Sequence, residues 1–292
     1  MRTWLRRLDG LWQQWLRVLV LAVAVTPFTA WAAVVAMVTD LQGKASIVES
    51  GVARSVNILA ELEAGVQVQL QAGATLVVLY LDGGDEYVLK GPALAVFRTG
   101  QPEVVNGLKA EKRSPALGNG VRIKPVGMAQ GAVVLRSLMP GARIRLLSLN
   151  GTRVLETEPE FRWQEMQPGL KYEFALSDDT GRALFETQVE GAALKLPANL
   201  PLKDGASYRW ELSARLPDGR RYSNAAVFSI ATPELRAQAV AFRSGAMAAV
   251  SARVSYAAWL DQVELKDEAR KYWRALSSER PDDERLKALA EQ

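Results

Sequence analysis

Carboxylates are the side chains through which this sequence could do chemistry, because the chain contains neither histidine nor cysteine. It therefore lacks the commonest general base, the commonest metal ligand, disulfides and a thiol nucleophile. A Ser-His-Asp triad is excluded. Two carboxylates can hydrolyse a glycosidic bond without histidine, but no pair of acids stands out here by its spacing. We expect no enzyme, no cofactor and no metal site.

One acidic cluster, Asp82, Asp85 and Glu86, could be interpreted as a calcium loop or as a pair of catalytic acids. It surrounds Gly83 and Gly84. Asp and Gly are favoured in tight turns for backbone reasons, and the spacing matches no calcium-binding loop. The sequence therefore favours a hairpin turn at this point.

Length and composition indicate an ordinary folded protein. The chain of 292 residues suffices for about two domains, and it is 49% hydrophobic and 23% charged. The net charge is +4, but much of the excess comes from Arg2, Arg6, Arg7 and Arg17 near the start. Nucleic-acid binding needs a clustered basic face on the folded part. We expect no nucleic-acid partner.

Residues 1–32 have the three parts of a secretory signal peptide. Arginines extend to Arg17, an apolar run covers residues 18–25, and Ala30 and Ala32 are small residues at a cleavage site. We expect cleavage after Ala32 and a periplasmic protein. The alternative is an inner-membrane protein anchored by residues 18–39, which carry no charge and are long enough to span a bilayer. In both cases the folded part lies outside the cytoplasm.

Residues 33–105 predict a small all-β domain. Apolar residues alternate with glutamines over residues 66–71, and residues 76–81 form the continuous apolar run of a strand buried on both faces. Residues 82–85 then form the turn into a returning strand at residues 87–89.

Three motifs in this region resemble the FecR domain, the periplasmic β domain of ferric-citrate-type regulators. They are Val35-Ala-Met-Val38, Gly43-Lys-Ala-Ser-Ile-Val48, and the run 76–81 with Asp82-Gly83 and Tyr87-Val-Leu89. The resemblance implies an exported bacterial protein. Full regulators carry a cytoplasmic anti-sigma domain before their membrane helix, whereas only about 17 residues precede the apolar run here, too few for a domain. We do not expect anti-sigma activity.

Residues 106–120 are rich in glycine and predict a linker, and residues 121–231 predict an immunoglobulin (Ig) or fibronectin type III-like β-sandwich. Residues 207–216 alternate strictly, with Tyr208 and Trp210 on the apolar face. With Phe161 and Trp163, these aromatic residues are expected to fill the space between two sheets. Asn150-Gly151 predicts a hairpin between residues 142–149 and 152–155. Further strands are expected at residues 121–126 and 132–136.

Residues 232–292 change to a helical period. Thr232 and Pro233 suit a helix start, and helices are expected near residues 247–263 and 266–278, with a short one after Pro281. The spacing of Tyr256-Ala257, Leu260, Ala269, Trp273 and Pro281 resembles one tetratricopeptide unit. One such unit cannot bury its apolar face alone. The unit must therefore pack on the sandwich, on a neighbouring chain or on a partner. The alternative is a plain helical hairpin docked on its own chain.

These features predict a mainly β fold with an α-helical C terminus. We expect a non-catalytic exported cell-envelope binding or scaffold protein whose partner is a protein or a glycan. The alternatives are a membrane-anchored periplasmic sensor or signalling accessory of the FecR type without the anti-sigma domain, and a carboxylate-based hydrolase. The candidate partner-binding residues are Tyr256, Trp259 and Trp273 in the tail, and Arg143 and Arg145 in the sandwich.

The two arginines belong to a wider candidate patch with Arg153 and Arg162, which could bind an acidic glycan or a lipid headgroup. Acidic residues such as Glu156 and Glu160 are interleaved nearby. This mixture favours an ordinary solvated outer face of the sandwich.

Overall fold

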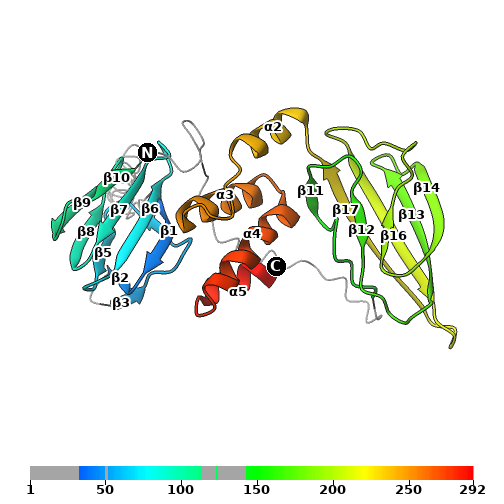
Figure 1. The fold of residues 1–292 in the computed structure, drawn as a ribbon, viewed down its shortest axis with the longest axis horizontal. Helices are drawn as coiled ribbons and strands as arrows, with labels where there is room; N and C mark the ends of the chain where they lie inside the picture. Colours follow the sequence, from blue (N-terminus) through cyan, green and yellow to red (C-terminus); the bar gives the residue numbers. More distant parts are fainter. Residues whose placement is uncertain (1–32, 50–51, 114–122, 124–142, 292) are drawn as a thin grey trace, which may run out of the picture. The chain divides into compact units, whose positions relative to one another are not determined.

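The computed structural model describes residues 33–49, 52–113, 123 and 143–291. The fold is mainly β, with several sheets followed by four C-terminal helices (Figure 1). This confirms the predicted fold class. The predicted signal peptide, residues 1–32, lies outside the described residues. Val34–Gln292 form one compact unit.

The first β region consists of two antiparallel five-stranded sheets (Figure 1). One sheet has the order β10-β7-β6-β1-β4, made of Glu111–Arg113, Glu86–Lys90, Thr75–Tyr80, Val34–Gln42 and Glu61–Glu63. The other has the order β3-β2-β5-β8-β9, made of Val52–Ser55, Ala45–Glu49, Gln67–Leu70, Ala93–Phe97 and Pro102–Asn106.

The first of these sheets is buried on both faces, which explains the continuous apolar run at residues 76–81. Leu76, Val78 and Tyr80 pack into a core shared with the second sheet. Leu79 and Met37 point the other way and pack against the C-terminal helices. Successive strand residues face opposite sides, so a two-sided sheet needs apolar residues at every position.

Two expectations about this region have clear outcomes. Asp82 and Asp85 lie in the turn between β6 and β7, where Gly84 N donates to Tyr80 O at 2.9 Å, so the predicted hairpin is confirmed. The expected linker at residues 106–120, in contrast, contains strand β10, which pairs with β7. Its residues 114–120 lie outside the described residues.

The described part of the second β region contains seven strands in two sheets. The larger sheet has the order β11-β17-β16-β13-β14, made of Thr152–Val154, Arg221–Ile230, Ser207–Arg215, Lys171–Asp178 and Ala183–Glu190. The smaller pairs β12 with β15, made of Glu160–Arg162 and Ala193–Lys195. Short strands that are antiparallel except for the pair of β11 and β17, with alternating inward aromatics, give a sandwich of the Ig and fibronectin type III kind.

The core of this sandwich is aromatic, as the sequence predicts. Phe161 and Trp163 are fully buried. Phe161 meets Trp210 edge-on with ring centroids 5.3 Å apart. Along β16 the side chains of Tyr208, Trp210, Leu212 and Ala214 are buried, while Arg209, Glu211 and Arg215 are exposed. Ser213 departs from the pattern, because it is buried on the outer face.

The predicted hairpin at Asn150-Gly151 is wrong. Leu146 forms a bridge to Trp163, beside the smaller sheet, whereas β11 pairs in parallel with β17 of the larger sheet. The turn therefore carries the chain from one sheet to the other, and Leu149 before it has a positive φ of 56°. A local turn signal cannot tell these two uses apart. The strands expected at residues 121–126 and 132–136 lie outside the described residues, apart from Ile123.

The C-terminal helices are α2 (Pro233–Ala241), α3 (Val250–Gln262), α4 (Lys266–Glu279) and α5 (Glu284–Glu291). The predicted helix start is confirmed, since Thr232 Oγ1 accepts from Leu235 N at 3.3 Å. The helices share one core with Met37, Ile58, Leu79 and Leu81 of the first β region. The tail is therefore docked on its own chain, as in the alternative of a plain helical hairpin, and the first β region rather than the sandwich supplies most of its apolar contacts.

Strand β1 also bears on the expected membrane anchor. Its first residue is Val34, so the last part of the span predicted at residues 18–39 is strand rather than helix. Among the helices that the structure describes, none is long and apolar enough to cross a membrane.

Candidate functional site

The three aromatic residues predicted to bind a partner are core residues. Tyr256, Trp259 and Trp273 are 2%, 4% and 1% exposed. Tyr256 and Trp259 stack with ring centroids 5.9 Å apart. Their helical spacing places them on the face that packs inward, so they offer no surface to a partner. This part of the predicted site is wrong.

The polar atoms of two of these rings are also satisfied internally. The Tyr256 hydroxyl donates to Ala239 O at 2.8 Å. Trp273 Nε1 donates to Asp261 Oδ2 at 2.7 Å. Burial raises the pKa of the Asp261 carboxyl above its ordinary value, and the indole hydrogen bond opposes part of that rise. Both contacts stabilise the folded tail.

Arg143 and Arg145 are exposed, as predicted, but the wider arginine patch is not formed. Arg153 reaches the helical tail, where its guanidinium donates to Val263 O at 3.2 Å and lies 3.5 Å from the Glu264 carboxylate. Arg162 lies 3.7 Å from Glu160. Arg153 and Arg162 are thus engaged within the chain, and we assign no ligand to any of the four arginines.

The helical tail contacts the first β region through a pair of partly buried charges. Arg280 Nη1 lies 2.6 Å from Asp40 Oδ1, with the two side chains 21% and 12% exposed. The same nitrogen donates to Leu41 O at 3.2 Å. Asp40 and Leu41 belong to β1, and Arg280 follows α4. The pair therefore joins segments far apart in the sequence.

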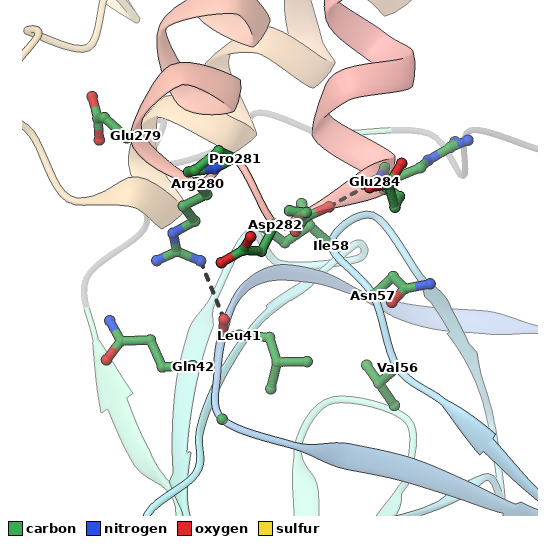
Figure 2. Close-up of a pocket in the computed structure, with 13 residues that line it drawn as sticks. Leu41, Gln42, Val56, Asn57, Ile58, Glu279, Arg280, Pro281, Asp282 and Glu284 are labelled. Carbon is green, nitrogen blue, oxygen red and sulfur yellow. Dashed lines mark hydrogen bonds between the residues drawn. The ribbon is translucent and has the colours of Figure 1, made fainter.

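Beside this contact lies an open groove of about 850 Å³. Figure 2 shows Arg280 reaching from the end of α4 to the Leu41 carbonyl, with Asp282 beside it and Gln42 and Val56 on the β side. Several charged side chains of the groove are already paired within the chain. The Glu279 carboxylate accepts from Arg253 at 2.5 and 2.6 Å, and Glu284 lies 2.8 Å from Lys287. We assign no ligand to this groove.

The tail also contacts the sandwich. Arg153 N donates to Glu264 O at 2.7 Å, and Thr152 Oγ1 donates to the same oxygen at 3.2 Å. Asp267 Oδ2 accepts from Leu149 N at 3.1 Å. Together with the Asp40 pair, these bonds make the helices a connector between the two β regions. The sequence holds no pairing signal for such contacts, because more than a hundred residues separate the partners.

A second open site lies on the outer face of the sandwich, as a trough of about 570 Å³ over β14, β13 and β16. Strand register aligns its residues in two rows that continue onto β17. The first row, read from β14 to β17, is Glu186, Ala175, Glu211 and Ala225. The second row is Gln188, Glu173, Ser213 and Ser223.

The trough has a small-residue floor and polar walls. Glu173 is engaged, because its Oε2 accepts from Ser213 Oγ at 2.9 Å and from Arg221 Nη2 at 3.1 Å. Among the described residues Glu186 and Glu211 form no ion pair. Carboxylates accept hydrogen bonds from hydroxyl and amino groups. The trough therefore presents carboxylate oxygens that can accept hydrogen bonds.

Sequence reasoning did not find this trough. Its residues come from several strands, and only the register between the strands places them together. Within the described ranges, no three acidic side chains lie close enough together to hold a metal ion.

Comparisons with known proteins add little. No protein-family model matches the chain, and no curated protein matches it. CopC from Methylosinus trichosporium OB3b is 17% identical, with a TM-score of 0.25, over 31% of this chain and 96% of that chain. A chain of a cytokine receptor complex is 13% identical, with a TM-score of 0.24, over 65% of this chain and 86% of that chain. Such distant likenesses carry no argument about function, so the fold assignment rests on the strands themselves.

Proposed function

We propose that this protein is a non-catalytic binding or scaffold protein of the bacterial cell envelope, which presents a FecR-like β domain and an Ig-like sandwich to a protein or glycan partner. One observation carries the proposal. The helical tail packs against both β regions of its own chain, while the polar trough of the sandwich stays open. The tail then serves as a connector, and the sandwich serves as the binding module.

The location in the envelope is supported by the sequence. Residues 1–32 have the pattern of an export signal, and the motifs around β1, β2 and β6 resemble the periplasmic FecR domain. The absence of cysteine fits any compartment, since the fold requires no disulfide.

The partner class follows from the chemistry of the trough. Its open carboxylates, Glu186 and Glu211, and its amide, Gln188, suit groups that donate hydrogen bonds. Sugar hydroxyls, amino sugars and basic side chains all have such donors. The small side chain of Ala175 between the two carboxylates leaves room for a donor to approach both.

Site-specific photocrosslinking in intact cells tests the proposal. A crosslinking amino acid replaces Gln188 in the trough or, as a matched control, the exposed Gln238 of α2 in the helical tail. We expect a discrete envelope adduct from position 188 and none from position 238. Equal adducts from both positions, or none from either, would contradict the assigned surface.

Cell fractionation and intact mass of the purified protein accompany the crosslinking. We expect a periplasmic protein that lacks residues 1–32. An uncleaved protein in the inner-membrane fraction would favour the anchored sensor instead, and a folded cytoplasmic protein would contradict both proposals.

A further inference from the structure

Glu86 is a buried carboxylate that forms no ion pair with any residue that the structure describes. It is the first residue of β7, where its register partners are Leu79 on β6 and Arg113 on β10. The residue is only 5% exposed. Its Oε1 atom is buried and accepts no hydrogen bond from any described residue.

The groups facing Glu86 come from three elements. Thr39 and Asp40 of β1 contribute a hydroxyl and a like charge, Ser251 of α3 contributes a hydroxyl, and Arg113 of β10 contributes a positive charge. Arg113 is exposed to water, so its attraction is screened. Arg280 is already paired with Asp40. The balance is unfavourable for a charged carboxylate at this point.

Burial accordingly raises the pKa of Glu86 above its ordinary value of 4.5. The hydrogen bond with Ser251, the charge of Arg113 and the hydrogen bond with Thr39 lower it in part, and the charge of Asp40 raises it further. A buried ion without full compensation is costly, so such a group takes a proton instead.

The position of Glu86 links this proton to the helical tail. Ser251 is itself only 3% exposed and belongs to the first turn of α3, whose N-terminal residue Ala249 provides no side-chain cap. The β1 strand that carries Thr39 and Asp40 is the strand that α3 contacts. Glu86 is therefore sealed from water by the docked tail, and undocking of α3 would expose it.

We propose that the helical tail docks on the first β region together with one proton held by Glu86, so that docking weakens as the pH rises. This inference stands independently of the partner-binding role proposed above. It makes the contact between tail and β region sensitive to the pH of the compartment.

The direction in which pH changes the docking equilibrium follows from proton linkage. In the undocked state Glu86 meets water, and its pKa is close to the ordinary value of 4.5. Below that pH both states are protonated, and docking has its full strength. Between the ordinary and the raised pKa only the docked state keeps the proton, so the docking equilibrium falls up to about tenfold per pH unit. Above the raised pKa both states are ionised, and no further loss occurs.

A second carboxylate works in the opposite direction but in another pH range. The hydrogen bond from Arg253 lowers the pKa of Glu279 below its ordinary value. Its contribution is therefore present above the ordinary carboxyl pKa and is lost only as the pH falls through the lowered value. Asp261 of α3 and Glu61 of β4 are further carboxyls whose pKa burial raises, so the Glu86→Gln substitution, and not the choice of pH, isolates the contribution of Glu86.

Thiol labelling tests the proposal, because the chain has no native cysteine. Ser255 is fully buried and lies one helical turn after Ser251 on the same face of α3. The rate at which a thiol reagent labels the S255C protein is measured from pH 5 to pH 8.5. At each pH this rate is divided by the labelling rate of the same protein unfolded in urea. This ratio removes the titration of the thiol itself and reports exposure of the α3 face.

The comparison uses two second-site changes. Glu86→Gln is isosteric and cannot ionise, whereas Glu111→Gln removes an exposed carboxyl of the same sheet. We expect protection to fall with rising pH in S255C and in S255C/E111Q, and to fall less steeply in S255C/E86Q, by up to about tenfold less per pH unit within the window, because only Asp261 and Glu61 still titrate there. If the cysteine variant does not fold, amide exchange of α3 in the E86Q and E111Q proteins gives the same comparison.

Two results would overturn the proposal. One is an identical pH dependence in the E86Q and E111Q backgrounds, including no dependence in either. The other is recovery of protection at pH 8.5 on adding millimolar calcium chloride to S255C but not to S255C/E86Q, which would mean that a cation rather than a proton neutralises Glu86.

Discussion

Replacing Trp273 decides whether the aromatic residues of the tail stabilise the fold or bind a partner. The side chain is 1% exposed and lies in the core shared by the helices and the first β region. An indole buries roughly 200 Å², which at about 25 cal/mol per Å² is worth roughly 5 kcal/mol. Partial relaxation of α4 and α5 around the cavity reduces the loss. We expect Trp273→Ala to lower the free energy of unfolding by about 3–5 kcal/mol.

A second substitution separates the stabilising effect of the indole hydrogen bond from that of the volume of the ring. Trp273→Phe keeps most of the ring but removes the donor to Asp261 Oδ2. The half-buried carboxylate then lacks this partner, at a cost of about 1–3 kcal/mol. The pKa of Asp261 rises further, because the bond that opposed the effect of burial is gone. The extra loss of stability is therefore largest above the pH at which Asp261 ionises in the folded protein.

The assay is urea unfolding at pH 7, followed by circular dichroism at the helical band. Arg274→Ala is the matched control, since its side chain is exposed on the same helix, and we expect a change within about 0.5 kcal/mol. The reasoning is refuted if Trp273→Ala unfolds at the same urea concentration as the control while the envelope crosslink at position 188 is lost. That result would make Trp273 a partner-binding residue after all.

Two further changes test the contacts that hold the tail. Asp40→Asn leaves the Arg280 guanidinium only its hydrogen bond to the Leu41 carbonyl, and we expect the free energy of unfolding in urea to fall by about 1.5–3 kcal/mol. The control Glu103→Gln breaks an exposed ion pair with Arg98 and should cost under about 1 kcal/mol. Equal losses in the two variants would show that the Asp40 pair is no stronger than a surface pair. Thr232→Ala removes the N-cap of α2 and should lower the free energy of unfolding by about 1 kcal/mol, whereas Thr232→Ser keeps a capping hydroxyl and should keep most of that stability. Identical stabilities of the Ala and Ser variants would contradict this role of the hydroxyl.

Local patterns in the sequence predicted the elements well where one residue pattern permits one structure. The alternation around Tyr208 and Trp210 can bury one face only as a strand, and Thr232-Pro233 begins a helix because each residue has the geometry of its position. The acidic turn at Asp82 and Asp85 follows from backbone preferences in the same way.

Predictions failed where a pattern fixes a local shape but not its neighbours. Asn150-Gly151 does turn the chain, but it connects two sheets instead of two paired strands. Tyr256 and Trp273 have helical spacing, but the spacing leaves open which surface covers them. Burial against Met37 and Leu79 decides that these rings are core residues.

The sequence by itself determined the kinds of element, the order in which they occur, and the chemistry that the chain lacks through having no histidine or cysteine. Only the tertiary structure decided which residues meet. The row from Glu186 to Ala225, the Asp40 to Arg280 pair and the enclosure of Glu86 all join residues from separate elements. The physical reason is that propensity and periodicity act over a few neighbouring residues, whereas strand register and helix docking are set by the free energy of burying whole faces together.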